Sequence, residues 1–513
     1  MNNKDSKAMK KNEKNKQSRR EFIKRSGISA GVLCTGILGG NSYAARESAP
    51  GKENENPSAK GIPKSNESAT LPFTATLPVV GHYDVVVCGG GPSGTAAALA
   101  AARRGLSVLL VEGHSQLGGN ATSGLVSEWL GGIHQGKWIV GGIFRELSLA
   151  GVERGWTTLS GDPSFQQGVA IDPNGVALLL EEFMEKAGVE VLLQTRMVDA
   201  FVEGDRIRHI VLLNKSGLHA VAAKTVVDAT GDADVAARSG CDYVKGRDED
   251  SLMTPVTLEF HVDQVDVKAL KTAINAPGEN NRFIKTIAGL KTRNIWPWDT
   301  DRLISRTLTQ TGVMMINTPR ILGVDGTSGR SLSDGIRRGR KEIFQLMDIA
   351  RKHFPGFENA RIRAVAPALG VRETRRIRGD IRMTVEDLAS GRRDDTVIAL
   401  SNWGWDLPDP KSGSHQPMYG KKKPEISVVP YGVMVPRPVG NLICPGRAIS
   451  VERDVLGPLR EMAPCMAMGE AAGTAAVQVV RRGLTFATID IQIMRADLRE
   501  HGAILDEKDA IRN

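Results

Sequence analysis

The clearest hydrophobic pattern in the 513-residue chain lies between residues 83 and 112. Val85–Cys88 is a short apolar run, as expected of a parallel strand that is buried on both faces. Thr95–Arg104 is alanine-rich and predicts a helix that packs closely on a sheet. Ser107–Val111 predicts a second buried strand. A strand, a helix and a strand in this order predict an α/β fold with a parallel sheet.

Later segments extend this pattern. Val189–Leu193 predicts a strand that leads into a meander with polar turns at 203–205 and 215–217. Much further along, Asn441–Ser450 predicts a strand and Cys465–Val480 predicts a Gly/Ala-rich helix. These late segments return the chain to the domain in which it began.

The stretch between about residues 241 and 430 has a different pattern. Met253–Val262 and Val313–Pro319 read as strands of an antiparallel sheet, and Leu332–Phe354 predicts a long amphipathic helix. The arginines on that helix are interpreted as a solvated face. We therefore expect an inserted α+β domain that caps the first one.

A glycine-rich turn follows the first strand. Gly89, Gly91 and Gly94 form the pattern G-x-G-x-x-G. Gly89 permits a tight turn, Gly91 lets backbone approach a pyrophosphate, and Gly94 allows close packing of helix on strand. The helix N-terminus supplies N–H groups to that pyrophosphate, and Glu112, at the end of the second strand, can accept from ribose hydroxyls. The predicted dinucleotide loop also includes Pro92 and Ser93.

Glu112 suits NAD and FAD equally. A second glycine turn, Leu117–Thr122, would let backbone approach a cofactor that extends beyond its pyrophosphate. Its candidate contact residues are Gly118, Gly119, Asn120 and Ala121.

Several stretches together resemble the FAD-dependent oxidoreductases that have a glutathione-reductase-type flavin domain, and more narrowly a bacterial family of that name. They are GGGPSGTAAALAAARRGLSVLLVE, LGGNATSG, VVDATGDADVA, PGFENARIRAVAPALGVRETRRIRGD and NLICPGRAISVERDVLGPLREMAPCMAMGEAAGTAA. The resemblance covers about residues 82–485. It implies an α/β, Rossmann-like FAD-binding domain with an inserted α+β substrate domain.

The resemblance also implies cofactor contacts. Backbone around Val198 would meet adenine, and the turn Ala229, Thr230 and Gly231 would pass near the dinucleotide. The flavin end would meet Gly446, Arg447, Gly469, Glu470, Gly473 and Thr474. A helix N-terminus near Gly469 would stabilise negative charge on the reduced flavin.

The formal net charge of +9 comes mostly from the N-terminal end of the chain. Residues 1–45 hold 10 Lys/Arg and 3 Asp/Glu, so the rest is nearly neutral and nothing favours nucleic acid. Ser18–Lys24 (SRREFIK) has the twin-arginine frame, and Ser26–Gly40 is too short for a membrane span. A small-x-small cleavage pattern ends at Ala44. We expect export by the twin-arginine machinery, which moves folded proteins, to the periplasm or another extracytoplasmic space, with no membrane span in the mature chain.

The five cysteines are scattered and predict no metal site. Cys88, Cys241 and Cys444 are expected to be buried thiols. The sequence contains no second G-x-G-x-x-G after a strand, no C-x-x-C and no haem motif. Electrons should therefore pass directly between substrate and flavin, and then to or from a separate acceptor or oxygen.

The chemistry of the cap is less defined. Seven arginines lie between residues 361 and 382. Arg372 or Arg375 could clamp an anionic substrate, or these side chains could form ion pairs that brace the two domains. Related sequences often carry a D-I-H-like element where this chain has Asp406-Leu407-Pro408, so His415 is the candidate catalytic histidine. The tryptophans of SNWGWDLPDP could form an aromatic wall or pack in a turn.

We predict an exported FAD enzyme that transfers a hydride between a small, anionic or sugar-like substrate and flavin N5. The alternatives are a reductase of activated double bonds, like fumarate reductase, and a flavin-binding protein without turnover. The predicted organisation is a signal peptide (1–44), a linker (45–80), a first FAD-binding part (81–240), a substrate or cap domain (241–430), a second FAD-binding part (431–490) and a C-terminal tail (491–513).

Overall fold

The computed structural model describes residues 71–159, 168–308, 312–414 and 422–512. Ala75–Asn513 forms one compact unit, which carries every element discussed below. The predicted signal peptide and most of the predicted linker lie outside the described residues. None of the described helices combines the length and apolarity needed to cross a bilayer.

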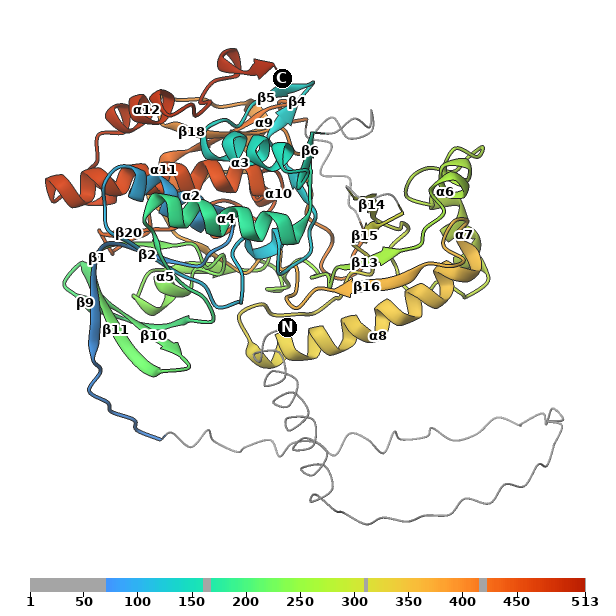
Figure 1. The fold of residues 1–513 in the computed structure, drawn as a ribbon, viewed down its shortest axis with the longest axis horizontal. Helices are drawn as coiled ribbons and strands as arrows, with labels where there is room; N and C mark the ends of the chain where they lie inside the picture. Colours follow the sequence, from blue (N-terminus) through green and yellow to red (C-terminus); the bar gives the residue numbers. More distant parts are fainter. Residues whose placement is uncertain (1–70, 160–167, 309–311, 415–421, 513) are drawn as a thin grey trace, which may run out of the picture. The chain divides into compact units, whose positions relative to one another are not determined.

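A central sheet organises the first domain (Figure 1). Its strand order is β8 (Glu190–Leu192), β2 (Val108–Val111), β1 (Val79–Cys88), β11 (Gly217–Asp228), β10 (Arg206–Asn214) and β9 (Arg196–Glu203), and β20 (Leu442–Ile443) also pairs with β11. The pairs β8–β2, β2–β1, β1–β11 and β11–β20 are parallel, whereas β9, β10 and β11 form the antiparallel meander. The predicted α/β fold with a parallel, Rossmann-like core is confirmed.

Helices α2 (Pro92–Arg103) and α11 (Met462–Arg482) pack side by side against this sheet. A Cβ on Gly469 would lie 2.0 Å from Ser93 O, and one on Gly473 would lie 2.2 Å from Ala97 O. Both glycines are therefore needed for the two helices to touch. Because residue numbers increase together along both contacts, the two helices run parallel.

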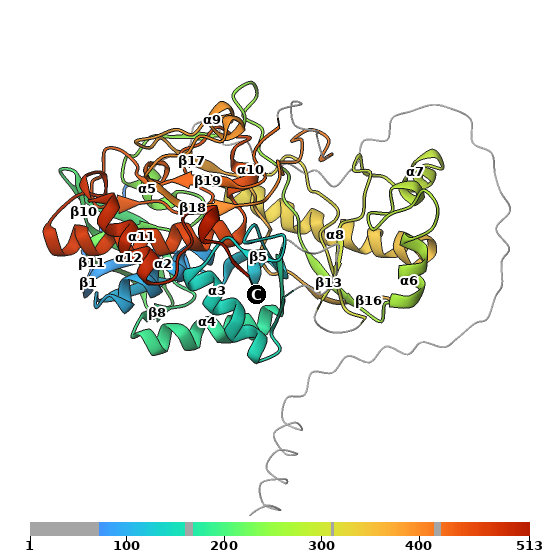
Figure 2. The ribbon, with the colours of Figure 1, turned by 90° about the horizontal axis from the view of Figure 1, so that it is seen from above.

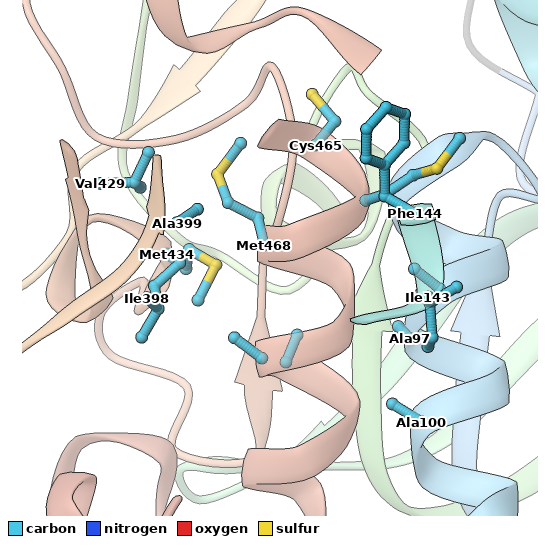
Figure 3. Close-up of a cluster of buried hydrophobic side chains, with 14 of the residues drawn as sticks. Ala97, Ala100, Ile143, Phe144, Ile398, Ala399, Val429, Met434, Cys465 and Met468 are labelled. Atoms are coloured by element: carbon cyan, nitrogen blue, oxygen red, sulfur yellow. The ribbon is translucent and has the colours of Figure 1, made fainter. Parts of the chain in front are cut away.

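The core around α11 has two sides, shown in Figure 3. On one side lie α2 and α3 (Gly142–Glu153), and on the other lie β18 (Val397–Ser401) and β19 (Ser427–Pro430). Of the labelled side chains, Ala97, Ala100, Ile143 and Phe144 lie on the first side and Ile398, Ala399, Val429 and Met434 on the second, whereas Cys465 and Met468 belong to α11 itself. The segment from Met383 onward thus contributes to this core and not to that of the cap. The four cysteines among the described residues are buried and free.

Smaller elements complete this domain. Two three-stranded sheets flank it. They are β3 (Glu128–Leu130), β7 (Gly168–Ile171) and β6 (Thr157–Leu159), and β4 (Ile133–His134), β5 (Lys137–Trp138) and β21 (Ile511–Arg512). The remaining helices include α4 (Pro173–Ala187), α5 (Asp234–Arg238), α9 (Val385–Ser390), α10 (Leu456–Leu459) and α12 (Ile491–Glu500).

The cap has its own antiparallel sheet and its own hydrophobic core. The strand order is β14 (Ser305–Thr307), β15 (Met314–Ile316), β13 (Phe260–Asp263) and β16 (Arg361–Val365). Helix α8 (Gly329–His353) runs along this sheet, with α6 (Val267–Ile274) and α7 (Ile284–Thr292) at one end, as Figure 2 shows from above. The strand predicted over 253–262 is confirmed only for its last part, because residues before Phe260 form isolated bridges to Ile321 and Gly370.

Candidate active site

The glycine loop after β1 passes so close to neighbouring backbone that Gly89 and Gly94 leave no room for side chains. Gly89 has φ +103°, and a Cβ there would lie 2.4 Å from Ala229 O. A Cβ on Gly94 would lie 1.8 Å from Gly89 O. The loop, helix α2 and the 229–231 turn therefore pack closely together.

Gly91 is different, because it faces open space. A Cβ built on Gly91 would meet nothing within 4 Å. Gly91 is also the N-cap of α2 and gives the helix no side-chain cap, so the N–H groups of the first turn remain available. Gly119 borders the space, since its Cβ would lie 3.0 Å from Gly91 Cα, and Gly118 N donates to Gly90 O at 2.8 Å. The two glycine turns form a cradle that fits a pyrophosphate.

Glu112 lies at the end of β2, beside this cradle. Its Oε2 accepts from Gly90 N and its Oε1 from His114 N, both at 2.7 Å. The side chain of Arg196, at the start of β9, packs against Gly113, and Val198 follows on the same strand. This end of the cradle suits the ribose and adenine of a dinucleotide.

Arg447 defines the other end. Its guanidinium lies against Gly231, where a Cβ would come within 2.5 Å of Cζ. Its Nη2 donates to Asp232 Oδ1 at 2.8 Å, while its buried Nε has no partner among the described residues. Gly446, with φ +101°, brings this segment against Ser93. The open cradle and the unpartnered Nε fit a dinucleotide that continues past its pyrophosphate.

Helix α11 continues in that direction. Gly469 faces Ser93, the second residue of α2, but α11 begins at Met462, seven residues before Gly469. The N-terminus of α11 therefore extends about 9 Å beyond that of α2, at 1.5 Å per residue.

The expected helix N-terminus near Gly469 is wrong, because Gly469 lies about two turns inside the helix. Gly469 and Gly473 pack against α2, and the buried Glu470 carboxylate accepts from Ile143 N of α3 at 3.0 Å. Thr474 Oγ1 donates to Glu470 O at 2.8 Å within the helix.

A cluster of charged side chains surrounds the N-terminus of α11. Glu461 is the N-cap residue and is buried, and Arg460 Nη1 lies 3.3 Å from its Oε1. Arg460 Nη2 donates to Asp406 O at 2.8 Å and contacts Asp406 Oδ2 at 3.3 Å. Burial raises the pKa of Glu461 to about 7 despite Arg460. Burial would also raise the pKa of Asp406, but the guanidiniums of Arg460, Arg320 and Arg372 outweigh it and hold that pKa at about 2.

The cap supplies the other side of this cluster. Arg372 donates from Nη1 to Pro255 O and from Nη2 to Asn317 Oδ1, both at 2.9 Å. Glu259 is fully buried with its Oε2 unpartnered in the described part of the chain, and burial raises its pKa to about 8. Asp406 and Arg372 lie deep in the protein, yet both keep solvent-accessible surface, 28% for the Asp406 side chain. We call this set of buried and partly accessible charged groups the cleft: Glu259, Arg320, Arg372, Asp406, Arg460 and Glu461.

The rest of the GVRETRR stretch forms a junction away from this cleft. Arg375 Nη1 donates to Asp232 O and to Asp234 Oδ1, both at 2.8 Å, and its Cζ lies 5.3 Å from the Tyr243 ring centre. Thr374 Oγ1 donates to Asp232 Oδ1 at 2.7 Å. The structure thus brings Arg372 to the cleft and holds Arg375 at the turn that borders the cradle.

His415 lies outside the described residues. Trp403 donates from Nε1 to Asp406 Oδ2 at 3.3 Å. The sequence reasoning missed five residues of the cleft: Glu259, Arg320, Asp406, Arg460 and Glu461. The adjacent charges of Arg460 and Glu461, just before an apolar helix, are the signal that could have found two of them. The described residues contain no group of three or more side chains suited to a metal ion.

The parallel sheet and the glycine cradle define a dinucleotide-binding protein of the Rossmann-like class. The sequence profile described as FAD dependent oxidoreductase matches residues 84–498, so the chain belongs to that family. It is an FAD-dependent oxidoreductase, and the residues of the cradle would hold the FAD.

Curated relatives match only in part. The chain is 32% identical over 157 residues to a digeranylgeranylglycerophospholipid reductase of Methanosarcina acetivorans, which is 29% of this chain and 38% of the relative. It is 30% identical over 167 residues to a thiamine thiazole synthase of Methanococcus vannielii, 30% of this chain and 58% of that protein. The matched part is thus well under two thirds of either relative.

Two solved structures are similar to this chain over most of its length. A geranylgeranyl bacteriochlorophyll reductase-like protein from Thermoplasma acidophilum has a TM-score of 0.43 at 12% identity, covering 82% of this chain and 84% of that one. A p-nitrophenol 4-monooxygenase from Pseudomonas putida has a TM-score of 0.43 at 14% identity, covering 82% and 85%.

Proposed function

We propose that this enzyme is exported and transfers a hydride between a small-molecule substrate and N5 of its flavin, in the cleft between the cap and the N-terminus of α11. The observation that carries the proposal is the position of the charged cluster that we call the cleft. It lies along α11, whose N-terminus extends about 9 Å past that of α2 at the phosphate cradle. FAD supplies the hydride acceptor when it is bound.

Two carboxyl groups of the cleft are suited to different roles. Asp406, with a pKa of about 2, stays ionised and holds Arg460 in place. Glu461, with a pKa of about 7, can take or give a proton at neutral pH. Environments that separate two carboxyl pKa values in this way are typical of acid/base assignments. We assign to Glu461 the proton that moves as the hydride moves. The first-turn N–H groups of α11 stabilise negative charge that develops nearby.

The test is anaerobic bleaching of the flavin absorbance against a panel of hydroxy acids, amines and sugars. With a substrate in hand, Glu461→Gln should lower the rate of flavin reduction by about 10²- to 10⁴-fold, as loss of a general acid or base does. Flavin content should be unchanged. The control is Glu203→Gln, which alters an exposed glutamate on β9. Equal reduction rates for Glu461→Gln and the wild type would remove Glu461 from the chemistry.

The direction of hydride transfer is determined by a second assay, which starts from the anaerobically reduced enzyme and follows its reoxidation. If anaerobically reduced enzyme is reoxidised by an activated alkene, the enzyme is a reductase of double bonds. If it is reduced by an alcohol or amine and reoxidised by oxygen or an added acceptor, it is an oxidase or dehydrogenase. Glu461, whose pKa of about 7 lets it take or give a proton, fits either direction, and the assay decides between them.

Export is proposed from the twin-arginine frame of Ser18–Lys24. Because that route carries folded proteins, FAD would be inserted before export. Replacing Arg19 and Arg20 with lysine preserves charge but removes the pair that the route reads. Normal export and processing of the double-lysine form would overturn this part of the proposal.

A further inference from the structure

We infer that the cleft binds a substrate that carries a carboxylate, and that Arg320, Arg372 and Arg460 recognise it. The inference rests on the proposed function, because it names the substrate class of the same cleft. Three guanidiniums from separate parts of the chain converge there, and one of them has an edge with no hydrogen-bond partner among the described residues. Arg320 and Arg372 belong to the cap, and Arg460 precedes α11.

Arg320 is the most informative of the three. Its exposed fraction is 9%, and its one hydrogen bond within the described chain runs from Nη1 to Gly413 O at 2.7 Å. Its Nε is buried without a partner there. A guanidinium carries five N–H groups, and leaving buried ones unpaired is costly. The Nε–Nη2 edge offers two N–H donors side by side, a spacing that matches the two oxygens of a carboxylate.

Hydrogen bonds hold the other two arginines, Arg372 and Arg460, close to Arg320. Arg372 donates to Asn317, three residues before Arg320. Arg460 donates to Asp406, on the same loop as the Gly413 that accepts from Arg320. The Nε of Arg460 also lacks a partner among the residues described. The three guanidinium groups thus lie around one loop and one cap segment.

The charges of the cleft do not balance without an anion. Nearby acids are engaged elsewhere, since Glu128 pairs with Arg306 at 3.2 Å and Glu373 pairs with Arg376 and Arg453. Burial keeps Glu259 mostly neutral at pH 7, and among the described residues Asp406 is the strongly ionised acid that faces all three arginines. Three cations against one anion and the partly ionised Glu461 leave an excess of positive charge. A neutral sugar would not offset it, whereas a carboxylate would.

The experiment titrates the oxidised holoenzyme with acetate, glycolate and succinate and with the corresponding amides, at constant ionic strength. Binding is read from the change in flavin absorbance. We expect saturable changes with at least one acid and none with its amide. Arg320→Gln should raise the Kd for that acid about ten- to a hundredfold, as loss of charge-assisted hydrogen bonds implies. Arg340→Gln, an exposed arginine of α8, is the matched control and should bind normally.

Arg320→Lys covers the case in which the glutamine variant does not fold. It keeps the charge but loses the fork, and we expect weaker binding with an unchanged melting curve. The inference fails if amides bind as well as acids, if inorganic phosphate binds more tightly than every carboxylate, or if folded Arg320 variants bind with the wild-type Kd. Bleaching by a neutral substrate with no carboxylate binding would sink the inference and leave the proposed function standing. Carboxylate binding with no redox turnover in either direction would support the inference and contradict the proposed function.

Discussion

The buried carboxylate of Glu373 should be the single most sensitive charge in the junction between cap and FAD-binding domain. Its side chain is fully buried, accepting from Arg376 Nη1 at 2.7 Å, from Arg453 Nε at 3.1 Å, and from Thr254 N and Oγ1 at 2.9 and 2.7 Å. Arg376 is only 1% exposed. Glu373→Gln keeps the shape but leaves that guanidinium as a buried charge without its counter-ion.

Removing one partner of a buried ion pair costs about 3–5 kcal/mol. We expect the lower end, because Arg453 also has Asp454 at 3.4 Å and Arg376 still donates to Gly246 O at 3.0 Å. With a urea m-value of about 3 kcal/mol/M, a loss of about 3 kcal/mol moves the unfolding midpoint by about 1 M. The assay is urea unfolding followed by tryptophan fluorescence, with flavin release recorded in parallel.

The matched control is Glu203→Gln, which removes an exposed partner of Arg208 at 3.2 Å, with side-chain exposures of 73% and 52%. An exposed pair contributes at most about 1 kcal/mol, so its midpoint should shift by less than about a third as much. If Glu373→Gln shifts the midpoint no more than Glu203→Gln does, Glu373 is not a buried counter-ion and the junction described here is wrong.

Three further predictions follow from the site. Gly91→Val should lack flavin absorbance but keep the urea midpoint of flavin-free wild type, because its side chain enters open space, whereas Gly94→Val should fall below that midpoint through its clash with Gly89 O. The pKa of Glu259 is about 8 in the folded state and about 4.5 in the unfolded state, so the folded state holds a proton that the unfolded state has lost between these values. The free energy of unfolding therefore falls as the pH rises from about 4.5 to 8. Glu259→Gln should make the urea midpoint less dependent on pH in this range. Arg375→Lys should lower the midpoint or the flavin content while turnover per bound flavin stays normal, because Arg375 binds Asp232 and Asp234 and not the cleft.

The cradle could be predicted from the sequence because its parts are local. Gly89, Gly91 and Gly94 act within one turn, and the strand and helix that flank them have clear hydrophobic patterns. The sequence predicts α11 from Cys465, three residues after its start at Met462, but the helix N-terminus that would face the flavin was expected near Gly469. The lack of a side chain at Gly469 instead serves contact with Ser93 inside the helix. A glycine that permits close packing and one that permits a turn look the same in a sequence.

The cleft could not be predicted, because its charged groups come from segments that are far apart. Glu259, Arg320, Asp406 and Glu461 have no common spacing, and each one alone reads as an ordinary surface charge. Their chemical properties depend on the tertiary structure, because burial raises the pKa of Glu461 while neighbouring arginines lower that of Asp406. The arginine-rich stretch was recognised, but its division into Arg372 at the cleft and Arg375 at the junction depends on tertiary contacts.

Asp232 couples the cradle to the cap. Its carboxylate accepts from Arg447 Nη2 at 2.8 Å and from Thr374 Oγ1 at 2.7 Å, and its carbonyl accepts from Arg375 at 2.8 Å. Arg447 belongs to the cofactor site, and the other two belong to the stretch that ends the cap. A dinucleotide contact to the free Nε of Arg447 would fix the guanidinium that also holds Asp232. Cofactor binding should therefore stabilise the cap junction as well as the cradle, by the amount that binding favours the folded state. A route that exports folded protein would then carry cap, junction and FAD as one assembled unit.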